Sequence, residues 1–158
     1  MSIPVEAFQL KPLGECEPGE LVRVGGEWCL IIQFDEEERG YVALTGERRG
    51  QPTVSKGGQR PALVIQEGFH WRSCIESADV VQQVRDAPLG SLVISGSDWA
   101  IWVGQPNDWA PFGVTLFGSG DIVVDESKMA RAVSWSAELY EDEPYRHLGT
   151  LFKVGDSR

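Results

Sequence analysis

Short apolar runs separated by glycine-rich turns recur along the chain, and apolar and polar residues alternate within them with the two-residue period of β-strands. The segment LVRVGGEWCLII (21–32) divides into two such runs joined at Gly25-Gly26, a dipeptide able to take the positive φ that a tight hairpin turn needs. LVISGSDWAIWV (92–103) repeats this arrangement around Gly96-Ser97. The pattern predicts an all-β fold built from small barrels or sandwiches.

One ten-residue phrase occurs twice, as GELVRVGGEW at 19–28 and as GSLVISGSDW at 90–99, 71 residues further on. A weaker match follows it, where YVALTG at 41–46 aligns with GVTLFG at 113–118. The consistent spacing predicts an internal duplication. The alternative is two generic hairpins with similar turn chemistry. The predicted units are 1–76 and 77–147, which leaves 148–158 as an additional C-terminal strand or tail.

Each predicted unit has only about 70 residues, so the two are expected to pack around a shared core. Trp28 and Trp99 hold the same position in the repeated phrase and are predicted to anchor that core, one per unit. The sequence PGELVRVGGEWCLI (18–31) resembles the opening of many small SH3-like or barrel domains, a resemblance that implies unit size and not function. At most one short helix is expected, near 77–86, with a strand or an irregular turn as the alternative.

The formal charge is −10, from 24 acidic and 14 basic side chains. Such a surface repels nucleic-acid phosphates and anionic lipids, so neither is an expected partner, whereas a basic protein is. Acidity that serves solubility alone is the simpler reading of the same charge. No apolar run approaches the ~18 residues of a membrane helix, and the opening MSIPVEAFQLKP lacks the pattern of a secretory signal. The expected location is the cytoplasm.

The residues that support catalysis are few. The chain has two histidines and three widely spaced cysteines, and it lacks the nucleophile-elbow, zinc-protease and phosphate-loop motifs. We therefore expect no catalytic residues, no metal and no cofactor. A hydrolase that uses carboxylates or the pair His70 and Cys74 is a remaining alternative, although four strand residues would place those two beyond hydrogen-bond reach.

The predicted binding residues lie on three kinds of loop. An aromatic loop, GQPNDWAPFG (104–113), offers large apolar contacts at little cost in rotamer entropy. Two acidic loops would steer a basic partner, and a basic loop could bind a phosphate or an acidic partner. The residues are Asp108, Trp109 and Phe112 (aromatic loop), Asp35, Glu36, Glu37, Glu38, Glu141, Asp142 and Glu143 (acidic loops), and Arg48, Arg49, Lys56 and Arg60 (basic loop).

These features favour a non-enzymatic interaction protein, for example an inhibitor or immunity-type protein that binds a macromolecule. The alternative is a β module that binds a small ligand or a carbohydrate on exposed tryptophans. The oligomeric state does not follow from the sequence.

Overall fold

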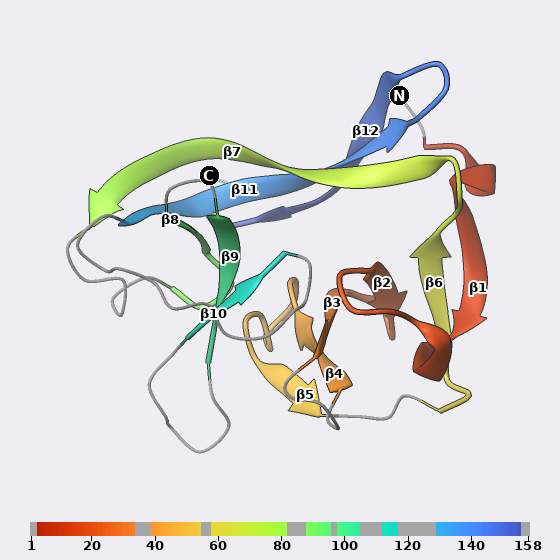
Figure 1. The fold of residues 1–158 in the computed structure, drawn as a ribbon, viewed down its shortest axis with the longest axis horizontal. Helices are drawn as coiled ribbons and strands as arrows, with labels where there is room; N and C mark the ends of the chain where they lie inside the picture. The colour runs from red at the N-terminus through yellow and green to blue at the C-terminus, as the bar shows by residue number, and fades with distance from the viewer. Residues whose placement is uncertain are drawn as a thin grey trace.

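The computed structural model describes residues 3–33, 39–54, 58–81, 88–95, 98–104, 112–116 and 129–155. The described residues form strands joined by turns, with two short 3-10 helices near the start of the chain (Figure 1). This confirms the all-β prediction. The elements are η1 (Val5–Ala7), β1 (Phe8–Pro12), η2 (Leu13–Glu15), β2 (Leu21–Val24), β3 (Glu27–Gln33), β4 (Arg39–Ala43), β5 (Pro52–Val54), β6 (Pro61–Ile65), β7 (Phe69–Val81), β8 (Leu92–Ser95), β9 (Asp98–Val103), β10 (Phe112–Thr115), β11 (Met129–Glu141) and β12 (Arg146–Val154).

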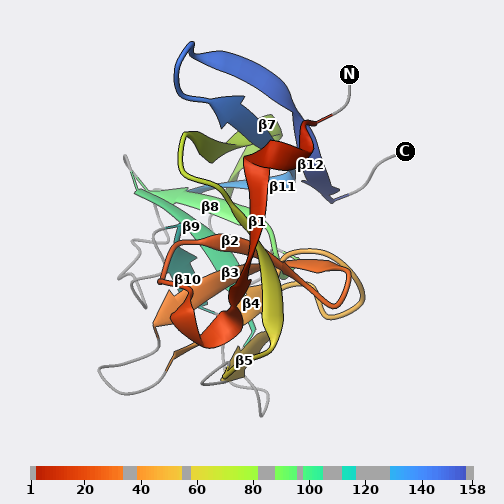
Figure 2. The ribbon, with the colours of Figure 1, turned by 90° about the vertical axis from the view of Figure 1, so that its right-hand side faces the viewer.

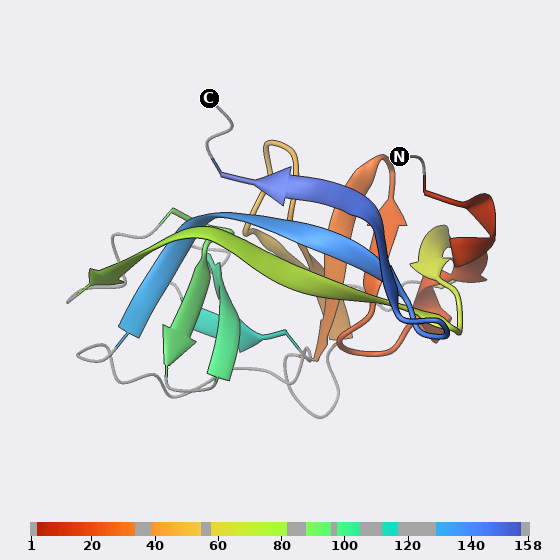
Figure 3. The same cartoon turned by 90° about the horizontal axis from the view of Figure 1, so that it is seen from above.

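The strands form two antiparallel sheets. The first has the order β1-β6-β2-β3-β4-β5, and the second has the order β10-β9-β8-β11-β12, with β7 also paired to β11. Residues 129–131 of β11 pair with β7 and β8 at once, so these two strands flank β11 on opposite sides. Seen from above, β7, β11 and β12 run together across the molecule as long twisted strands (Figure 3). The end of the β11–β12 hairpin extends beyond the other strands (Figure 2).

The repeated phrase folds into two hairpins with the same register. Leu21 lies opposite Leu30 in β2–β3, and Leu92 lies opposite Ile101 in β8–β9. The strand order β1-β6-β2-β3-β4 also has a counterpart in β7-β11-β8-β9-β10. The geometry of the two hairpins is therefore shared, while their origin in a duplication stays a prediction.

The glycine that opens each phrase has the same role in both copies. Gly19 has φ 92° and Gly90 has φ 90°, a backbone region that glycine adopts without steric penalty. Each donates a 2.8 Å backbone hydrogen bond, Gly19 to the carbonyl of Ile31 and Gly90 to that of Trp102. These bonds close both hairpins just before the first strand begins.

The long strand β7 runs without interruption through residue 76, where the boundary between the predicted units was placed. Its described part includes 77–81, so a strand and not a helix occupies this portion of 77–86, and 82–87 lie outside the described residues. The C-terminal segment contributes β12, which pairs with β11 in the second sheet.

The two sheets pack on one shared core. Trp135 is 1% exposed, and its indole Nε1 donates a 2.9 Å hydrogen bond to the carbonyl of Gly90. The ring of Phe152 contacts both Trp135 and Trp28, with centroids 5.7 and 5.8 Å away. The buried members of the core are Leu21, Trp28, Leu30, Ile32, Val42, Leu44, Leu92, Ile101, Val103, Val114, Ala132, Trp135, Ala137, Phe152 and Val154.

Candidate functional site

A cleft with a volume of about 860 Å³ lies between the two sheets, next to the first half of β7. Segments far apart in the sequence meet there: the start of β2, the end of β6, the start of β7, the start of β9 and the end of β10. The lining residues are Gly19, Glu20, Leu21, Ile65, Phe69, His70, Trp71, Arg72, Ser73, Trp99, Thr115 and Leu116.

Two tryptophans from different strands give this cleft its aromatic surface. Trp71 and Trp99 are half-buried and pack against the shared core on one side while lining the cleft on the other. Within the described residues, neither indole N–H has a hydrogen-bond partner. Leu116 and Ile65 also pack against the core and extend the apolar wall. A bound group would therefore meet broad apolar and aromatic faces.

The strand β7 contributes five consecutive residues, 69–73, to the lining. Because side chains alternate between the faces of a strand, a run of consecutive lining residues indicates that the backbone edge itself borders the cleft. In the described part of the chain β7 pairs only with β11, along one edge. The N–H and C=O groups on its other edge, between His70 and Ile75, have no backbone partner in that part of the chain.

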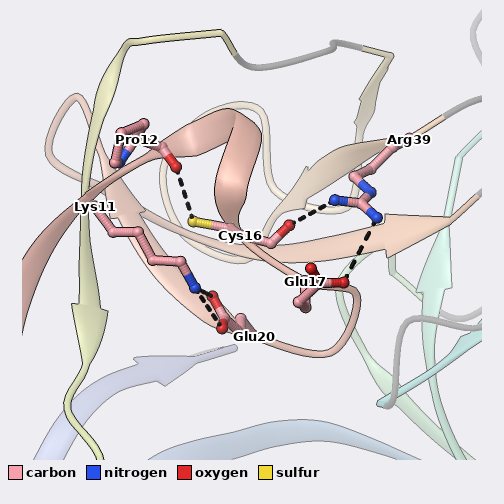
Figure 4. A network of polar contacts seen from close by, with 6 residues as sticks. All are labelled: Lys11, Pro12, Cys16, Glu17, Glu20 and Arg39. Carbon is pink, nitrogen blue, oxygen red and sulfur yellow. Dashed lines mark hydrogen bonds and ion pairs between the residues drawn. The ribbon is translucent and has the colours of Figure 1, made fainter.

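A network of polar contacts holds Glu20 at the cleft (Figure 4). Lys11 of β1 forms an ion pair with Glu20 at 3.1 Å, between the ammonium Nζ and the carboxylate Oε1. Burial favours a lower pKa for Lys11, but the hydrogen bond and charge of Glu20 outweigh it and raise this pKa above its ordinary value. Arg39 of β4 donates a 2.9 Å hydrogen bond to the carbonyl of Cys16 and pairs with Glu17 at 3.6 Å. The loop before β2 is thus tied to β1 and to β4.

None of the cysteines forms a disulfide, and their environments differ. Burial raises the pKa of the Cys16 thiol to about 11 and that of the Cys29 thiol to about 12, so both are protonated and unreactive at neutral pH. Cys74 is exposed on β7. The register of β7 with β11 runs one for one from Phe69 to Ile75, so His70 and Cys74 are about 13 Å apart along the strand and form no pair.

The opposite face of β7 carries a cluster of rings and charges. His70 stacks on Tyr140 and Tyr145, with ring centroids 5.5 and 5.9 Å apart, and its Nδ1 contacts the carboxylate of Asp142. Arg72 lies over both tyrosine rings, with its Cζ 5.7 and 5.5 Å from their centroids. The ring partners of His70 come from β11 and the following turn, whereas its neighbour Trp71 faces the other side of the strand, because adjacent strand residues face opposite sides.

The acidic turn predicted at 141–143 lies at the end of the β11–β12 hairpin. Glu141 accepts a 2.7 Å hydrogen bond from Arg146, and Asp142 contacts His70. The neighbouring Glu138 is 8% exposed, and its Oε1 lies 2.8 Å from Nε2 of His147. Two of the three predicted carboxylates therefore have partners, Arg146 of β12 and His70 of β7, and Glu143 is exposed.

The basic loop is only partly within the described residues. Arg48 donates a 3.1 Å hydrogen bond to Thr53, and Arg49 donates a 3.2 Å hydrogen bond to the carbonyl of Leu89. Arg60 is exposed just before β6. Arg49 thus links the turn after β4 to the segment before β8. Outside the described residues lie Asp35, Glu36, Glu37, Glu38, Lys56, Asp108 and Trp109.

Phe112 is the first residue of β10, where its backbone pairs with Val103. Among the described residues that line the cleft, none belongs to the predicted binding set. Trp99 was predicted only as a core anchor, and Trp71 was not assigned to a site. The alternation of Phe69, Trp71 and Ile75 along FHWRSCI could have placed these three residues on one face. The order of strands in the second sheet leaves one edge of β7 without a strand partner among the described residues. This order cannot be predicted from the residues of β7 alone.

A comparison of the chain with protein-family models, curated proteins and solved structures finds no match among any of them. Among the described residues no helix has the length and apolar character needed to cross a membrane. The same residues include no group of three or more histidine, cysteine, aspartate or glutamate side chains placed to hold a metal ion. The cleft, the edge of β7 that is unpaired among the described residues, and the two tryptophans are thus the surfaces that this part of the chain offers for binding.

Proposed function

We propose that this chain is a non-enzymatic interaction protein that holds part of a partner protein in the cleft beside β7. The observation that carries the proposal is the position of Trp71 and Trp99, half-buried against the core with their remaining surface in the cleft. Tryptophan is among the residue types that contribute most to binding energy at protein interfaces. An inhibitor or immunity-type protein that covers a basic toxin or effector is the concrete form of this proposal.

The scaffold supports such a role because the contact residues are held in position before binding. Trp71 lies in β7, which pairs with β11, and Trp99 lies in β9, which pairs with β8. The carboxylate of Glu20 is held by its ion pair with Lys11. A preformed site loses little conformational entropy when its partner arrives. The formal charge of −10 adds long-range attraction for a basic partner.

A second candidate function is the binding of a small ligand or carbohydrate in the same cleft. It is favoured by the cleft's volume of about 860 Å³, since small-molecule sites occupy roughly 300–1,000 Å³ and are lined mainly by apolar and aromatic side chains.

Site-specific photo-crosslinking in the native host tests the proposal. Benzoylphenylalanine replaces Trp71 or Trp99 in separate variants, and it replaces Val54 on the distant edge strand β5 as the control. We expect the two cleft variants to crosslink the same protein and the Val54 variant not to do so. Absence of a crosslinked protein from both cleft positions would contradict the proposal. A tryptophan fluorescence response to small molecules in that case would favour the second candidate.

A further inference from the structure

We infer that the partner binds by adding an extended segment to the free edge of β7 as an extra strand. This inference rests on the proposed function, and it specifies the shape and chemistry of the partner segment. It predicts apolar side chains at alternate positions, directed into the cleft, and basic residues at the end that lies near Phe69.

The first support is the backbone edge of β7 that has no strand partner among the described residues. From Phe69 to Ile75 the strand pairs one for one with Glu141 to Trp135 of β11, with no register shift. In an antiparallel arrangement every second residue of such a strand directs its N–H and C=O away from its neighbour. Over about 20 Å, roughly three residues therefore present both groups on the free edge. An edge of this length is a template for pairing with another chain.

The second support is that the free edge and the cleft are next to each other. Residues 69–73 line the cleft consecutively, so a strand placed on this edge has its alternate side chains over Trp71, Trp99 and Leu116. Strand addition commonly combines backbone hydrogen bonds with pockets for every second side chain. The apolar wall of the cleft supplies such a pocket here.

The third support is charge. The Phe69 end of β7 lies beside the turn that contains Glu141, Asp142 and Glu143, since Asp142 N–H donates a 2.9 Å hydrogen bond to the carbonyl of Gly68. Glu67 precedes the strand and is exposed. Arg146 pairs with Glu141, and His70 contacts Asp142. Arg72 lies over the neighbouring tyrosine rings, so four carboxylates stand against two arginines at this end. The excess of negative charge favours lysine or arginine in the partner segment at this end.

The same charges disfavour a second copy of this chain as the occupant. Two molecules that each carry a formal charge of −10 repel one another. The segment is therefore assigned to a different, basic protein, and self-association becomes an outcome that the experiment detects.

A peptide selection followed by amide hydrogen exchange tests the inference on the full chain. The probe is a library of capped heptapeptides with Val, Leu, Ile, Phe or Trp at alternate positions and Lys, Ser or Thr between them. We expect selection of peptides with lysine at one end, and binding should slow the exchange of alternate amides between His70 and Ile75. The amides of Thr53 and Val54 on the edge strand β5 provide the control and should exchange as before.

An N-methylated analogue separates strand pairing from side-chain contact. Methyl groups on alternate peptide amides remove the backbone donors and leave the side chains in place. If those amides face β7, we expect the affinity to fall by about 30-fold or more, as for the loss of two or three hydrogen bonds. Methylation of the other alternate set should have a much smaller effect. The replacement Glu20→Gln should weaken binding only a few-fold, and Val54→Ala should not change it.

Three results of the peptide experiments would overturn the inference. They are failure of the selection to yield a peptide, unchanged exchange at 70–75 with a bound peptide, and equal affinity of both methylated analogues and the parent. Dimers that protect the same amides without any peptide would also overturn it, in favour of self-association. In each case crosslinking of a protein from Trp71 and Trp99 would leave the proposed function standing, whereas its absence would remove that function as well.

Discussion

Trp28 and Trp99 occupy the same register position in two equivalent hairpins, yet one is a core residue and the other lines the cleft. Trp28 lies opposite Arg23 and Trp99 lies opposite Ile94. Trp28 is 8% exposed because Phe152 of β12 stacks on its ring at 5.8 Å. No described ring packs on Trp99 in the same way. A strand outside the repeated phrase therefore decides which tryptophan remains available for contact.

Alanine replacements at these two positions should differ in their effect on stability. Trp28→Ala removes a buried ring and should lower the free energy of unfolding by about 3–5 kcal/mol. Trp99→Ala should cost about half of that or less, because part of its surface is already in contact with solvent. Urea unfolding of both variants measures the difference. Equal losses would show that Trp99 is as deeply buried as Trp28.

The hairpins were predictable because local pattern determines them. The dipeptide Gly25-Gly26 and the matched apolar positions of both phrases predict two hairpins. Both hairpins form, with Leu21 opposite Leu30 and Leu92 opposite Ile101. The prediction of Trp99 as a core anchor was only half correct, since it packs on the core and also lines the cleft.

The cleft itself could not be predicted from local pattern. Its residues come from five separate segments, and their meeting depends on how the two sheets pack. The ring partners of His70 are likewise remote, because Tyr140 and Tyr145 are about 70 residues further along the chain. Loops commonly carry binding residues, and the predicted binding residues lie on loops. Here the described candidate site lies instead along a strand edge.

Gly50 should tolerate alanine less well than Gly26, although both have positive φ, 79° and 85°. A Cβ on Gly50 would lie 2.4 Å from Cβ of Leu89 and 2.7 Å from the backbone nitrogen of Gly90. A Cβ on Gly26 would meet no described atom within 4 Å. Gly26→Ala should therefore cost about 1–2 kcal/mol for backbone strain alone, and Gly50→Ala should cost more.

Thermal unfolding of the two glycine variants checks this expectation. Gly50 also accepts a 2.8 Å hydrogen bond from the N–H of Gly104, so it lies where the segments before and after β8–β9 meet the turn after β4. If the Cβ added at Gly50 moves these segments apart, the cooperativity of thermal unfolding should fall as well as its midpoint temperature. An equal midpoint for both variants would mean that the turn moves without cost.

The buried thiols make stability depend on alkaline pH. Their folded-state pKa values, about 11 for Cys16 and about 12 for Cys29, are raised above the ordinary 9.0. A raised pKa contributes stability that is fully present below pH 9 and is lost as pH rises through the folded values. Each thiol should remove about 1.4 kcal/mol per pH unit over its window.

Denaturant unfolding between pH 8 and pH 11 measures this loss, with Cys29→Ala and Cys74→Ala as paired variants. Tyrosine and lysine side chains also titrate in this range, so the informative quantity is the difference in slope from the unmodified chain. Cys29→Ala should reduce the slope. In the unmodified chain the Cys29 thiol ionises at a lower pH in the unfolded state than in the folded state, and the variant lacks this difference. Cys74→Ala removes an exposed thiol and provides the control for the substitution itself. A steep slope retained in Cys29→Ala would refute the assignment.

A comparison of two buried tryptophans separates the contribution of the hydrogen bond to Gly90 to stability from the contribution of ring packing. Trp135 and Trp102 are 1% and 4% exposed. The indole of Trp135 donates to the carbonyl of Gly90, whereas that of Trp102 has no partner among the described residues. Replacement by phenylalanine shrinks both rings equally, but only Trp135→Phe leaves a buried carbonyl without its donor. Trp135→Phe should therefore be less stable than Trp102→Phe by about 1–3 kcal/mol in urea unfolding. Equal stability would show that water or a local shift satisfies the Gly90 carbonyl.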